Sequence, residues 1–417
     1  MGDERFERYL KAFEEETPVS IRLNPLKSQG LRVIGGEQVP WCPEGYYLPR
    51  RPNFTADPLL HAGCYYVQEA ASMFVSHVLS SLITSQIPLP SLNREGPGEG
   101  FGLLVLDLCA APGGKSTAAI AALPQGSTLY ANEPIRSRAS ILLENITKWG
   151  YPNCTVTNNY PRDYRASKLS FDIILCDVPC SGEGMFRRDA ATIREWSLQN
   201  VERCQQLQRQ IVSDAWACLN DGGLLVYSTC TFNTRENEEN IRWMLNEFDD
   251  AQVLPVDTKP EWNITGSLLP GFDYPVYRFI PGITRGEGLF ICAVRKIKRT
   301  TRPRPTPGPS LLREGRKISK SAQEHLHILL PSLNREGPGV GLVGCSLSYP
   351  QAIAYLRGES LTLPPDTPRG IVEVSFMGHP LGLAKNIGTR ANNLYPKEWR
   401  IKTTHTPTDY EAILEHT

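Results

Sequence analysis

The sequence lacks an excess of charge of either sign and lacks long apolar runs. Lys plus Arg and Asp plus Glu both number 44 among the 417 residues, so net charge does not indicate a polyanionic partner. No run approaches the roughly 18 apolar residues expected of a membrane span. The residues after Met1 form an acidic amphipathic pattern instead of a signal peptide. We therefore expect a cytoplasmic protein that does not associate with membranes.

Close cysteine pairs are also missing. The chain has eleven cysteines, and no two of them are spaced as CxxC. This pattern argues against a zinc site and against a small disulfide framework. We expect reduced thiols and no bound metal.

Low-complexity segments divide the chain, whose length predicts two or three domains. PSLNREGPG occurs at 90–98 and again at 331–339, with the related PSLLREG at 309–315. The unit is too short and too irregularly spaced for a solenoid, and its composition predicts turn-rich surface loops. We expect an N-terminal extension (1–86), an insert (87–101), a core domain (102–298), a linker (299–339) and a C-terminal module (340–417).

The linker region is basic. Ten Lys/Arg and one acidic residue lie between Arg295 and Lys320, together with four prolines at alternate positions from Pro303 to Pro309. This composition predicts an extended solvated tether, and an RNA-binding arm is the alternative.

Strands and helices alternate through the core domain. Apolar runs predict strands, and amphipathic runs between them predict helices. Such alternation is typical of an α/β fold with a parallel, doubly wound sheet, whose ligands lie at the carboxyl ends of the strands. Outside the core domain we expect a helix over 65–83 and a small β-rich segment around 370–386. The predicted core strands are 102–110, 127–133, 154–159, 171–179, 222–230 and 288–297, and the helices are 114–123, 136–150, 198–219 and 234–248.

The loop DLCAAPGGKST (107–117) follows the first of these strands. Its end resembles a phosphate-binding loop, G-x-x-x-x-G-K-[ST], but Cys109 stands where the first glycine is required. Glu133 lies twenty residues after Gly113, which is the spacing that places an acid on ribose hydroxyls in doubly wound folds. A nucleoside ligand without a triphosphate is favoured. An NTPase, with Asp177 managing magnesium, is the alternative, and Lys115 is otherwise an exposed lysine at a helix start.

Two cysteines follow predicted strands at the ligand edge of the sheet. Cys180 lies in CDVPCSGEGMFRRD, beside Asp177, and Cys230 lies in YSTCTFNTRENEEN. A thiol in an electropositive cleft ionises easily and becomes a nucleophile. Three other cysteines lie within apolar elements and are expected in the core: Cys176, Cys218 and Cys292.

These motifs resemble those of the Sun/Nop family of S-adenosylmethionine-dependent RNA (cytosine-5)-methyltransferases, in particular the bacterial RsmF type. The resemblance covers almost the whole chain. It rests on RLNPLK, YYVQEAASM, DLCAAPGGKST, NEPIRSR, DVPCSGEGMFRRD, STCTFNTRENEENI, RFIPGITRGEGLF and GHPLGLAKN…NLYPKEWR.

The resemblance implies an enzyme and a mechanism. It implies a Rossmann-like methyltransferase sheet with an N-terminal α/β extension and a β-rich, PUA-like RNA-binding C-terminal module. Cys230 is then the nucleophile that adds to C6 of cytidine, Cys180 assists release, and Asp177 bonds N3 of the ring. A catalytically inactive RNA-binding assembly factor is the alternative, although both Cys230 and Asp177 are present.

The resemblance also implies the cofactor and the partners. S-adenosylmethionine would be held by Asp177, Glu133, Arg138 and the loop residues Cys109, Ala110, Ala111, Pro112, Gly113, Gly114 and Lys115. Tyr160 stands where relatives carry an acid for the adenine, so Asn159, Asp163 or stacking on Tyr160 would replace it. We expect a monomer acting on small-subunit rRNA or an assembled subunit, with tRNA as the alternative. Candidate RNA contacts are Arg22, Asn24, Lys27, Arg187 and Arg188, whereas Gln68 is expected to be structural.

Overall fold

The computed structural model describes residues 2–84, 102–297, 344–403 and 407–417. Both PSLNREGPG copies, the PSLLREG segment and most of the basic linker lie outside the described residues. No helix within the described ranges is long and apolar enough to cross a membrane.

A central sheet carries the core domain, with strand order β11-β13-β10-β9-β6-β7-β8 and β12 paired to β13. β6 to β10 are mutually parallel, whereas β13 runs antiparallel to β10. The predicted α/β doubly wound class is confirmed, with a single reversed strand within this order. The bounds are β6 Leu104–Asp107, β7 Thr128–Asn132, β8 Cys154–Thr157, β9 Phe171–Asp177, β10 Leu219–Thr229, β11 Ala251–Leu254, β12 Tyr277–Phe279 and β13 Leu289–Lys296.

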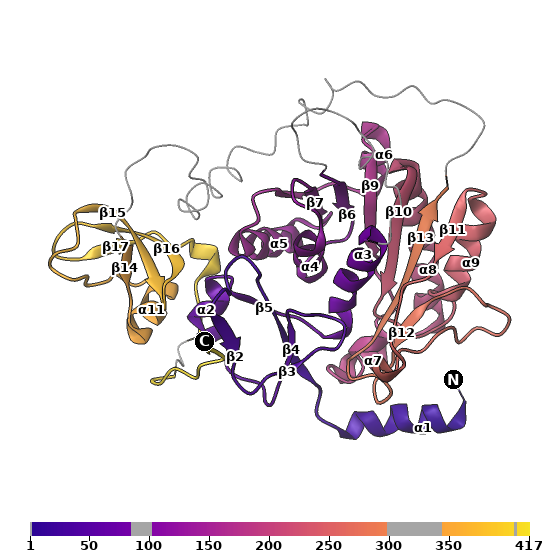
Figure 1. Ribbon diagram of the computed structural model, residues 1–417, viewed down its shortest axis with the longest axis horizontal. Helices are drawn as coiled ribbons and strands as arrows, with labels where there is room; N and C mark the ends of the chain where they lie inside the picture. The colour runs from indigo at the N-terminus through magenta and orange to yellow at the C-terminus, as the bar shows by residue number, and fades with distance from the viewer. Residues whose placement is uncertain (1, 85–101, 298–343, 404–406) are drawn as a thin grey trace.

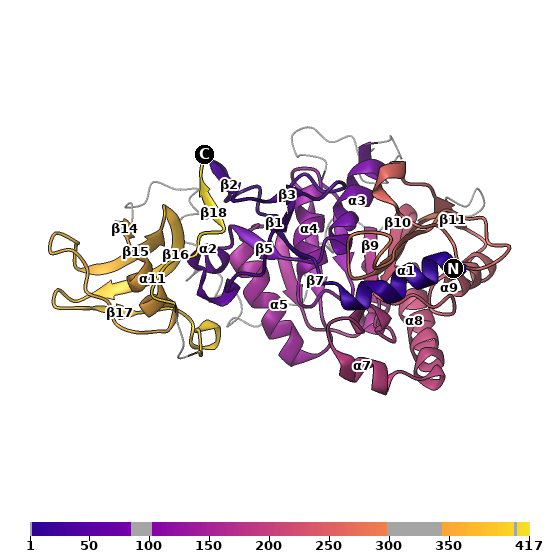
Figure 2. The same ribbon diagram turned by 90° about the horizontal axis from the view of Figure 1, so that it is seen from below.

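Helices cover both faces of this sheet (Figures 1 and 2). Alternate strand residues point to opposite faces, so Val105 joins one apolar cluster and Leu106 another. The first cluster takes side chains from α3 (Phe74–Thr84), α4 (Gly114–Ala122) and α5 (Arg136–Trp149). The second takes them from α6 (Pro161–Ser167), α8 (Leu198–Cys218) and α9 (Glu238–Glu247). Both faces are therefore buried, which explains the nearly continuous apolar runs.

The direction in which strands are added reverses between β6 and β9. The chain builds β6, β7 and β8 toward one side and then returns to place β9 and β10 on the other. The carboxyl ends of β6, β9 and β10 are thus neighbours at the switch point, where open α/β sheets bind ligands. The loops that follow these strands hold Cys109, Cys180 and Cys230.

The N-terminal extension contains helix α1 (Asp3–Lys11) and a four-stranded sheet of order β3-β4-β1-β5. The predicted helix over 65–83 is wrong in its first part. Tyr65–Val67 is strand β5, antiparallel to β1, and the helix α3 begins at Phe74. The remaining bounds are β1 Val19–Leu23, β2 Leu31–Val33, β3 Glu37–Gln38, β4 Gly45–Leu48, α2 Pro58–His61 and, in the core domain, α7 Ala190–Glu195.

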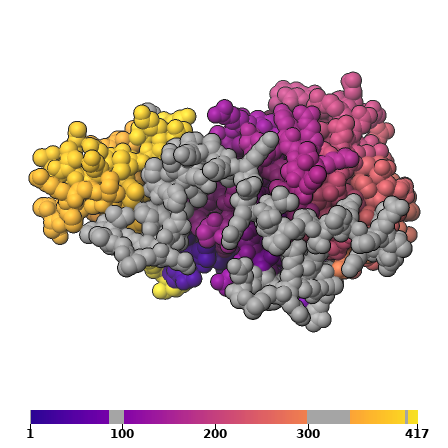
Figure 3. Space-filling model, turned by 90° about the horizontal axis from the view of Figure 1, so that it is seen from above, coloured from indigo at the N-terminus to yellow at the C-terminus, as the bar shows by residue number. Residues whose placement is uncertain are grey.

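The C-terminal module forms a lobe at one end of the molecule (Figure 3). It is β-rich, as expected: β14 (Gly344–Ser346), β15 (Gly370–Phe376), β16 (His379–Asn386) and β17 (Ala391–Asn393) form one sheet, with helix α11 (Tyr349–Leu356). Its apolar side chains share one cluster with those of the N-terminal extension. Strand β18 (Leu414–His416) completes the contact by pairing with β2. The two segments form a common structure beside the central sheet, and we call this contact the junction.

Candidate active site

The cofactor loop predicted from the sequence connects β6 to α4. Gly113 caps the helix with φ 111°, a conformation that an L side chain adopts only with strain. The loop is tied to the end of β7, since the Ala110 N–H donates to the Asn132 carbonyl at 2.8 Å. The Asn132 amide in turn donates to the Leu108 carbonyl at 3.0 Å. The loop backbone is therefore fixed at the switch point.

Glu133 and Arg138 lie beside this loop. The Arg138 guanidinium donates to the Ala111 carbonyl at 3.1 Å and lies 3.4 Å from the Glu133 carboxylate. Glu133 is nearly fully buried and also accepts the Ile135 N–H at 2.9 Å. Arg138 thus links the loop to a carboxylate at the end of β7. A buried acid beside a glycine-containing loop is the donor set that suits the ribose and amino-acid parts of a nucleoside cofactor.

Burial raises the pKa of two groups near the loop. Burial raises the pKa of Asp107 to about 7, and its carboxylate accepts the Ser116 hydroxyl at 2.6 Å. Burial also holds the pKa of the Cys109 thiol well above its ordinary value. Cys109 is therefore a thiol and not a thiolate, which suits a wall residue.

Lys115 and Asp177 form an ion pair across the site. The Lys115 ammonium donates to the Asp177 carboxylate at 2.9 Å, and Ser228 donates to its other oxygen at 2.8 Å. Although burial opposes the charge, Asp177 holds the pKa of Lys115 above its usual range. This lysine, from the helix after the first strand, is committed to a carboxylate at the end of β9. The alternative that Lys115 is merely an exposed lysine at a helix start is wrong, because its side chain is mostly buried in this pair.

Cys180 and Cys230 meet at the ligand edge. Their sulfur atoms are 3.3 Å apart, although the residues follow different strands. Either sulfur could donate in this contact, and with Cys180 as the donor the hydrogen bond lowers the pKa of Cys230 and raises that of Cys180 well above the ordinary value. The charge of Lys115 lowers the pKa of Cys230 further. Cys230 is consequently the more acidic thiol of the pair.

Cys230 differs from the other cysteines in the direction of its pKa shift. All eleven lie within the described residues, and burial raises the pKa of the other nine outside the pair. Cys176, Cys218 and Cys292 are buried in the core, as predicted. Cys230 alone combines a lowered pKa with a position at the ligand edge.

Most of the predicted RNA contacts are internal instead. Arg22 is buried, lies over the Trp149 ring, and donates to Gln68 at 2.7 Å and to the Thr117 hydroxyl at 2.6 Å. It therefore fixes the N-terminal extension to α4, and Gln68 has the structural place expected of it. Asn24, Lys27 and Arg187 are likewise bonded internally, through the Trp149, Ala62 and Glu287 oxygens. Of the five, only Arg188 is exposed.

Tyr160 stands at the beginning of α6 and is about half exposed, with Arg162 over its ring. Asp163, one of the alternatives for the adenine, accepts the Tyr160 N–H at 2.9 Å and so caps this helix. The Asn159 N–H donates to the Asn132 side chain at 3.0 Å. Asp163 is thus engaged locally, whereas the Tyr160 ring remains accessible for stacking.

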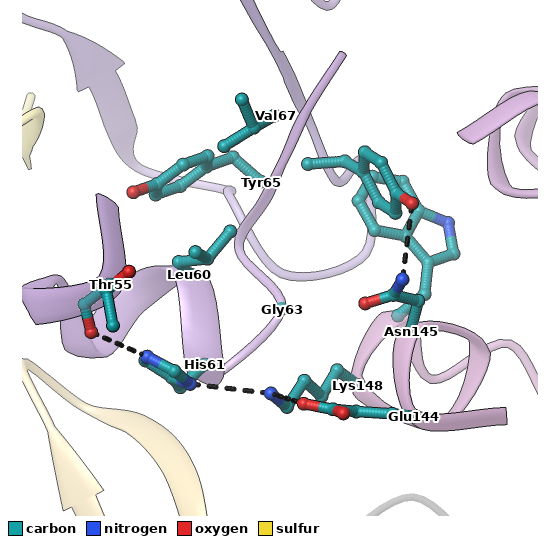
Figure 4. Close-up of a pocket in the computed structure, with 11 residues that line it drawn as sticks. Thr55, Leu60, His61, Gly63, Tyr65, Val67, Glu144, Asn145 and Lys148 are labelled. Carbon is teal, nitrogen blue, oxygen red and sulfur yellow. Dashed lines mark hydrogen bonds and ion pairs between the residues drawn. The ribbon is translucent and has the colours of Figure 1, made fainter. Parts of the chain in front are cut away.

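A cavity of about 290 Å³ lies behind the loop, between the N-terminal extension and α5 (Figure 4). His61 lies between the Thr55 carbonyl and Lys148, and Lys148 pairs with Glu144. Tyr66, from the N-terminal extension, and Asn145, from α5, both donate to the Pro112 carbonyl, at 3.1 and 2.8 Å. The cavity contains none of the predicted catalytic residues, but two of its walls hold the cofactor loop.

Several buried residues around Asp177, Cys180 and Cys230 were missed at the sequence level. We call this region the catalytic edge. Glu183, Glu236, Glu238 and Arg278 are buried there, and Arg278 pairs with Glu238 and donates to the Phe232 carbonyl at 2.8 Å. The acids all lie within the two cysteine motifs or just after them. That proximity was the available signal, but a single sequence does not reveal which acids are buried.

Comparisons with known proteins identify the family of the chain. Family profiles match at residues 99–295 (16S rRNA methyltransferase RsmB/F), 1–70 (N-terminal domain of 16S rRNA methyltransferase RsmF) and 345–401 (methyltransferase RsmF PUA domain). Ribosomal RNA small subunit methyltransferase F of Cronobacter sakazakii is 30% identical, over 94% of this chain and 92% of the relative. The chain belongs to the RsmB/F family of 16S rRNA methyltransferases.

Further relatives extend this assignment. The Erwinia tasmaniensis methyltransferase F is 28% identical over 95% of this chain and 93% of its own. A methyltransferase homologue from Pyrococcus horikoshii has 28% identity and a TM-score of 0.56, covering 70% of this chain and 91% of the other. NSun6 from Pyrococcus horikoshii with SFG shares the fold at 21% identity and a TM-score of 0.54, covering 72% and 96%. The chain is thus an RNA methyltransferase of the RsmB/F class.

Proposed function

We propose that this chain transfers a methyl group from S-adenosylmethionine to C5 of a cytidine in small-subunit rRNA, through a covalent bond between Cys230 and C6. The observation that carries the proposal is the thiol pair. Cys230, the one cysteine with a lowered pKa, lies 3.3 Å from the sulfur of Cys180 at the ligand edge. Because the relatives are named small-subunit rRNA methyltransferases, we assign the same RNA class.

The chemistry of cytosine requires such a thiolate. C5 is too weak a nucleophile to attack a methyl donor directly, but thiolate addition at C6 converts the ring into an enamine-like species. The Cys230 sulfur forms the new bond to C6, and the electron pair displaced from the C5–C6 bond delocalises toward N3. A proton taken up from solvent by the Asp177 carboxyl, which Lys115 and Ser228 hold in place, is passed to N3 and neutralises the charge that develops there.

The cofactor site fits a nucleoside methyl donor. The loop from Cys109 to Lys115 would hold the methionine and ribose parts, with Glu133 on the ribose hydroxyls and Arg138 supporting both. When bound, S-adenosylmethionine supplies the electrophilic methyl group. The residues of this chain orient the donor at the edge where Cys230 activates the ring, so that reactants are brought together at the switch point.

Product release needs a second step. After transfer, a base removes the C5 proton, the electrons of that C–H bond restore the C5–C6 double bond, and the C6–S bond breaks. Cys230 leaves as thiolate, and the Cys180 thiol, which already donates to that sulfur, stabilises the departing charge. The target base must leave any helix to enter this pocket. The N-terminal extension and the PUA module are assigned to RNA binding on family grounds.

Covalent trapping tests the proposal. Cys180→Ala protein is mixed with S-adenosylmethionine and with 16S rRNA, tRNA or small ribosomal subunits, and the products are separated on a denaturing gel. We expect a denaturant-resistant protein–RNA adduct with rRNA or subunits, absent in Cys180→Ala/Cys230→Ala. Sequencing the trapped RNA identifies the nucleotide. No adduct with any RNA, by a variant that still binds S-adenosylmethionine, contradicts the mechanism, and an adduct with tRNA alone contradicts the substrate.

A further inference from the structure

Hydrogen bonds cross between the two loops that carry the cysteines. We call residues 178–187 the Cys180 loop and residues 230–237 the Cys230 loop. Glu183, in the Cys180 loop, accepts the backbone N–H groups of Phe232 and Asn233 at 2.7 and 2.8 Å. Glu236, in the Cys230 loop, accepts the backbone N–H of Ser181 at 3.0 Å. Each loop therefore supplies a carboxylate that binds the backbone of the other.

Both carboxylates are buried and fully engaged. Glu236 has no exposed surface and also accepts Gln208 at 2.7 Å, while Glu183 is largely buried and accepts the Trp196 indole N–H at 3.1 Å. The Asn233 amide donates to both acids, at 3.2 Å to Glu183 and 2.8 Å to Glu236. Charge-assisted hydrogen bonds of this kind are strong, and a buried carboxylate that loses them is costly. Moving either loop would leave a buried acid without partners.

The two backbones also meet directly beside the sulfur atoms. The Gly184 N–H donates to the Cys230 carbonyl at 2.7 Å, and a Cβ at position 184 would lie 2.5 Å from that oxygen. Hydroxyl groups of Ser181 and Thr231 lie 2.9 Å apart. Residues adjacent to each cysteine are thus fixed against the other loop.

We propose that Glu183 and Glu236 are positioning residues that hold the sulfurs of Cys180 and Cys230 in contact, each acting on the opposite loop. Their catalytic consequences rest on the proposed function. Glu183 fixes the loop of the attacking thiolate, so it serves formation of the adduct. Glu236 fixes the residue next to Cys180, so it serves release. The two acids therefore act on different steps, although they belong to one hydrogen-bond network.

Replacement of either glutamate by glutamine removes the charge and one acceptor oxygen but leaves the size of the side chain almost unchanged. Each carboxylate receives donors on both oxygens, Glu183 from backbone on one side and from Trp196 and Asn233 on the other. An amide presents N–H₂ in place of one oxygen, so donor would face donor. Glu183→Gln and Glu236→Gln are thus expected to loosen the contact with little change in volume.

The first measurement needs neither RNA nor cofactor. Phenylarsine oxide condenses with two adjacent thiols, PhAsO + 2 RSH giving PhAs(SR)₂ and water, and it binds far more weakly to one thiol. Full-length protein is titrated with the reagent in competition with a small dithiol. Cys180→Ala defines one-thiol binding, which we expect to be at least 100-fold weaker than in the native protein. We expect Glu183→Gln and Glu236→Gln each to weaken binding at least tenfold.

The matched control is Asp57→Asn at the junction. Asp57 is a buried carboxylate that also accepts a backbone N–H and side-chain donors, but it lies away from the cysteines. Its replacement should leave arsenical binding unchanged. Native-like affinity in both glutamine variants overturns the proposal, as does native affinity no greater than that of Cys180→Ala. If the glutamine variants do not fold, Asn233→Ala, which removes the shared donor, decides the matter: we expect about threefold weaker binding, and no change overturns it.

The second measurement separates the two roles. With rRNA and S-adenosylmethionine, Glu236→Gln should accumulate at least tenfold more covalent adduct than the native protein, because release is slowed. Glu183→Gln should form adduct at least tenfold more slowly. Equal behaviour of the two variants overturns the division of roles. Absence of adduct even in Cys180→Ala would instead contradict the proposed function, and the arsenical result would stand independently.

Discussion

Buried ionisable groups have different partners at the catalytic edge and at the junction. At the catalytic edge, ionised groups are paired: Arg278 with Glu238, Arg187 with Glu287 and Lys115 with Asp177. At the junction, burial pushes groups toward neutrality. It raises the pKa of Asp57 to about 6 and lowers those of His61 and Lys27 to about 3 and about 8.

The difference follows from the partners. Asp57 accepts the Tyr65 and Tyr410 hydroxyls, and Lys27 donates to the Ala62 and Lys148 carbonyls, all of which are neutral dipoles. Dipoles offset desolvation less completely than an opposite charge does. The catalytic edge is not uniform, because burial also raises the pKa of Asp107, whose side-chain partner is the Ser116 hydroxyl, and that of Glu287 despite its arginine partners. An opposite charge thus accompanies each group of the three ion pairs at the catalytic edge, whereas neutral dipoles accompany Asp57 and Lys27 at the junction.

The largest effect is expected from removing one charge of a fully buried pair. Arg278→Met leaves the Glu238 carboxylate uncompensated in a site with no exposed side-chain surface. Such a change costs about 3–5 kcal/mol of stability. Urea unfolding of the native and variant proteins measures it. The double variant Arg278→Met/Glu238→Gln should recover most of the loss, and a single-variant loss below about 1 kcal/mol would contradict the importance of the pairing.

A slightly smaller effect is expected where the pair meets the substrate. Asp177→Asn removes the charge that Lys115 holds and the carboxyl proposed to act at N3. We expect kcat for rRNA methylation to fall about 10²–10³-fold, as for loss of one charge-stabilising group, with cofactor affinity changed much less. Single-turnover methyl transfer from labelled cofactor measures it. Asp189→Asn, at the exposed N-cap of α7, is the control, and an unchanged kcat in Asp177→Asn would refute the assignment.

The smallest effect is expected at the junction and depends on pH. The folded-state pKa of Asp57, about 6, exceeds its ordinary value of 3.8, so the folded protein favours the protonated acid. The stabilising contribution of that acid is present below about pH 4 and is lost as pH rises to about 6, by up to about 3 kcal/mol. Asp57→Asn removes this dependence and keeps an N-cap. Unfolding free energies of both proteins are measured from pH 3.5 to 7. The value of the native protein should fall relative to that of Asp57→Asn as pH rises from about 4 to about 6, and a constant difference would exclude the effect.

Much of the core domain was predictable because its signals are local. Continuous apolar runs placed the main strands, and the strand-ending motifs placed Asp177, Cys180 and Cys230 at one edge. The helix predicted over 65–83 failed at its start because Tyr65–Val67 pairs with β1, more than forty residues earlier. Tyr and Val favour strands, and pairing with a distant strand decided the conformation.

The supporting residues of the site were not predictable, for a similar reason. Arg22 has the composition of an RNA contact, yet it is buried because α4 and Trp149 surround it in the fold. In the sequence, Glu183 and Glu236 look like ordinary acids of the two cysteine motifs. Each accepts hydrogen bonds from the backbone of the opposite loop only because β9 and β10 are neighbours in the sheet. Motifs specify which residues do the chemistry. The side chains that hold them come from parts of the chain whose proximity only the fold determines.

The pairing of β18 with β2 has a consequence for synthesis of the chain. Asp57 and Tyr410, which meet at the junction, are 353 residues apart. At about 5–20 residues per second, the ribosome makes Tyr410 roughly 20–70 s after Asp57. The entropic cost of closing so long a loop grows only slowly with its length. Until then, the apolar side of the N-terminal extension has no covering partner. The time for which this apolar side stays uncovered during synthesis is therefore set by the speed of translation.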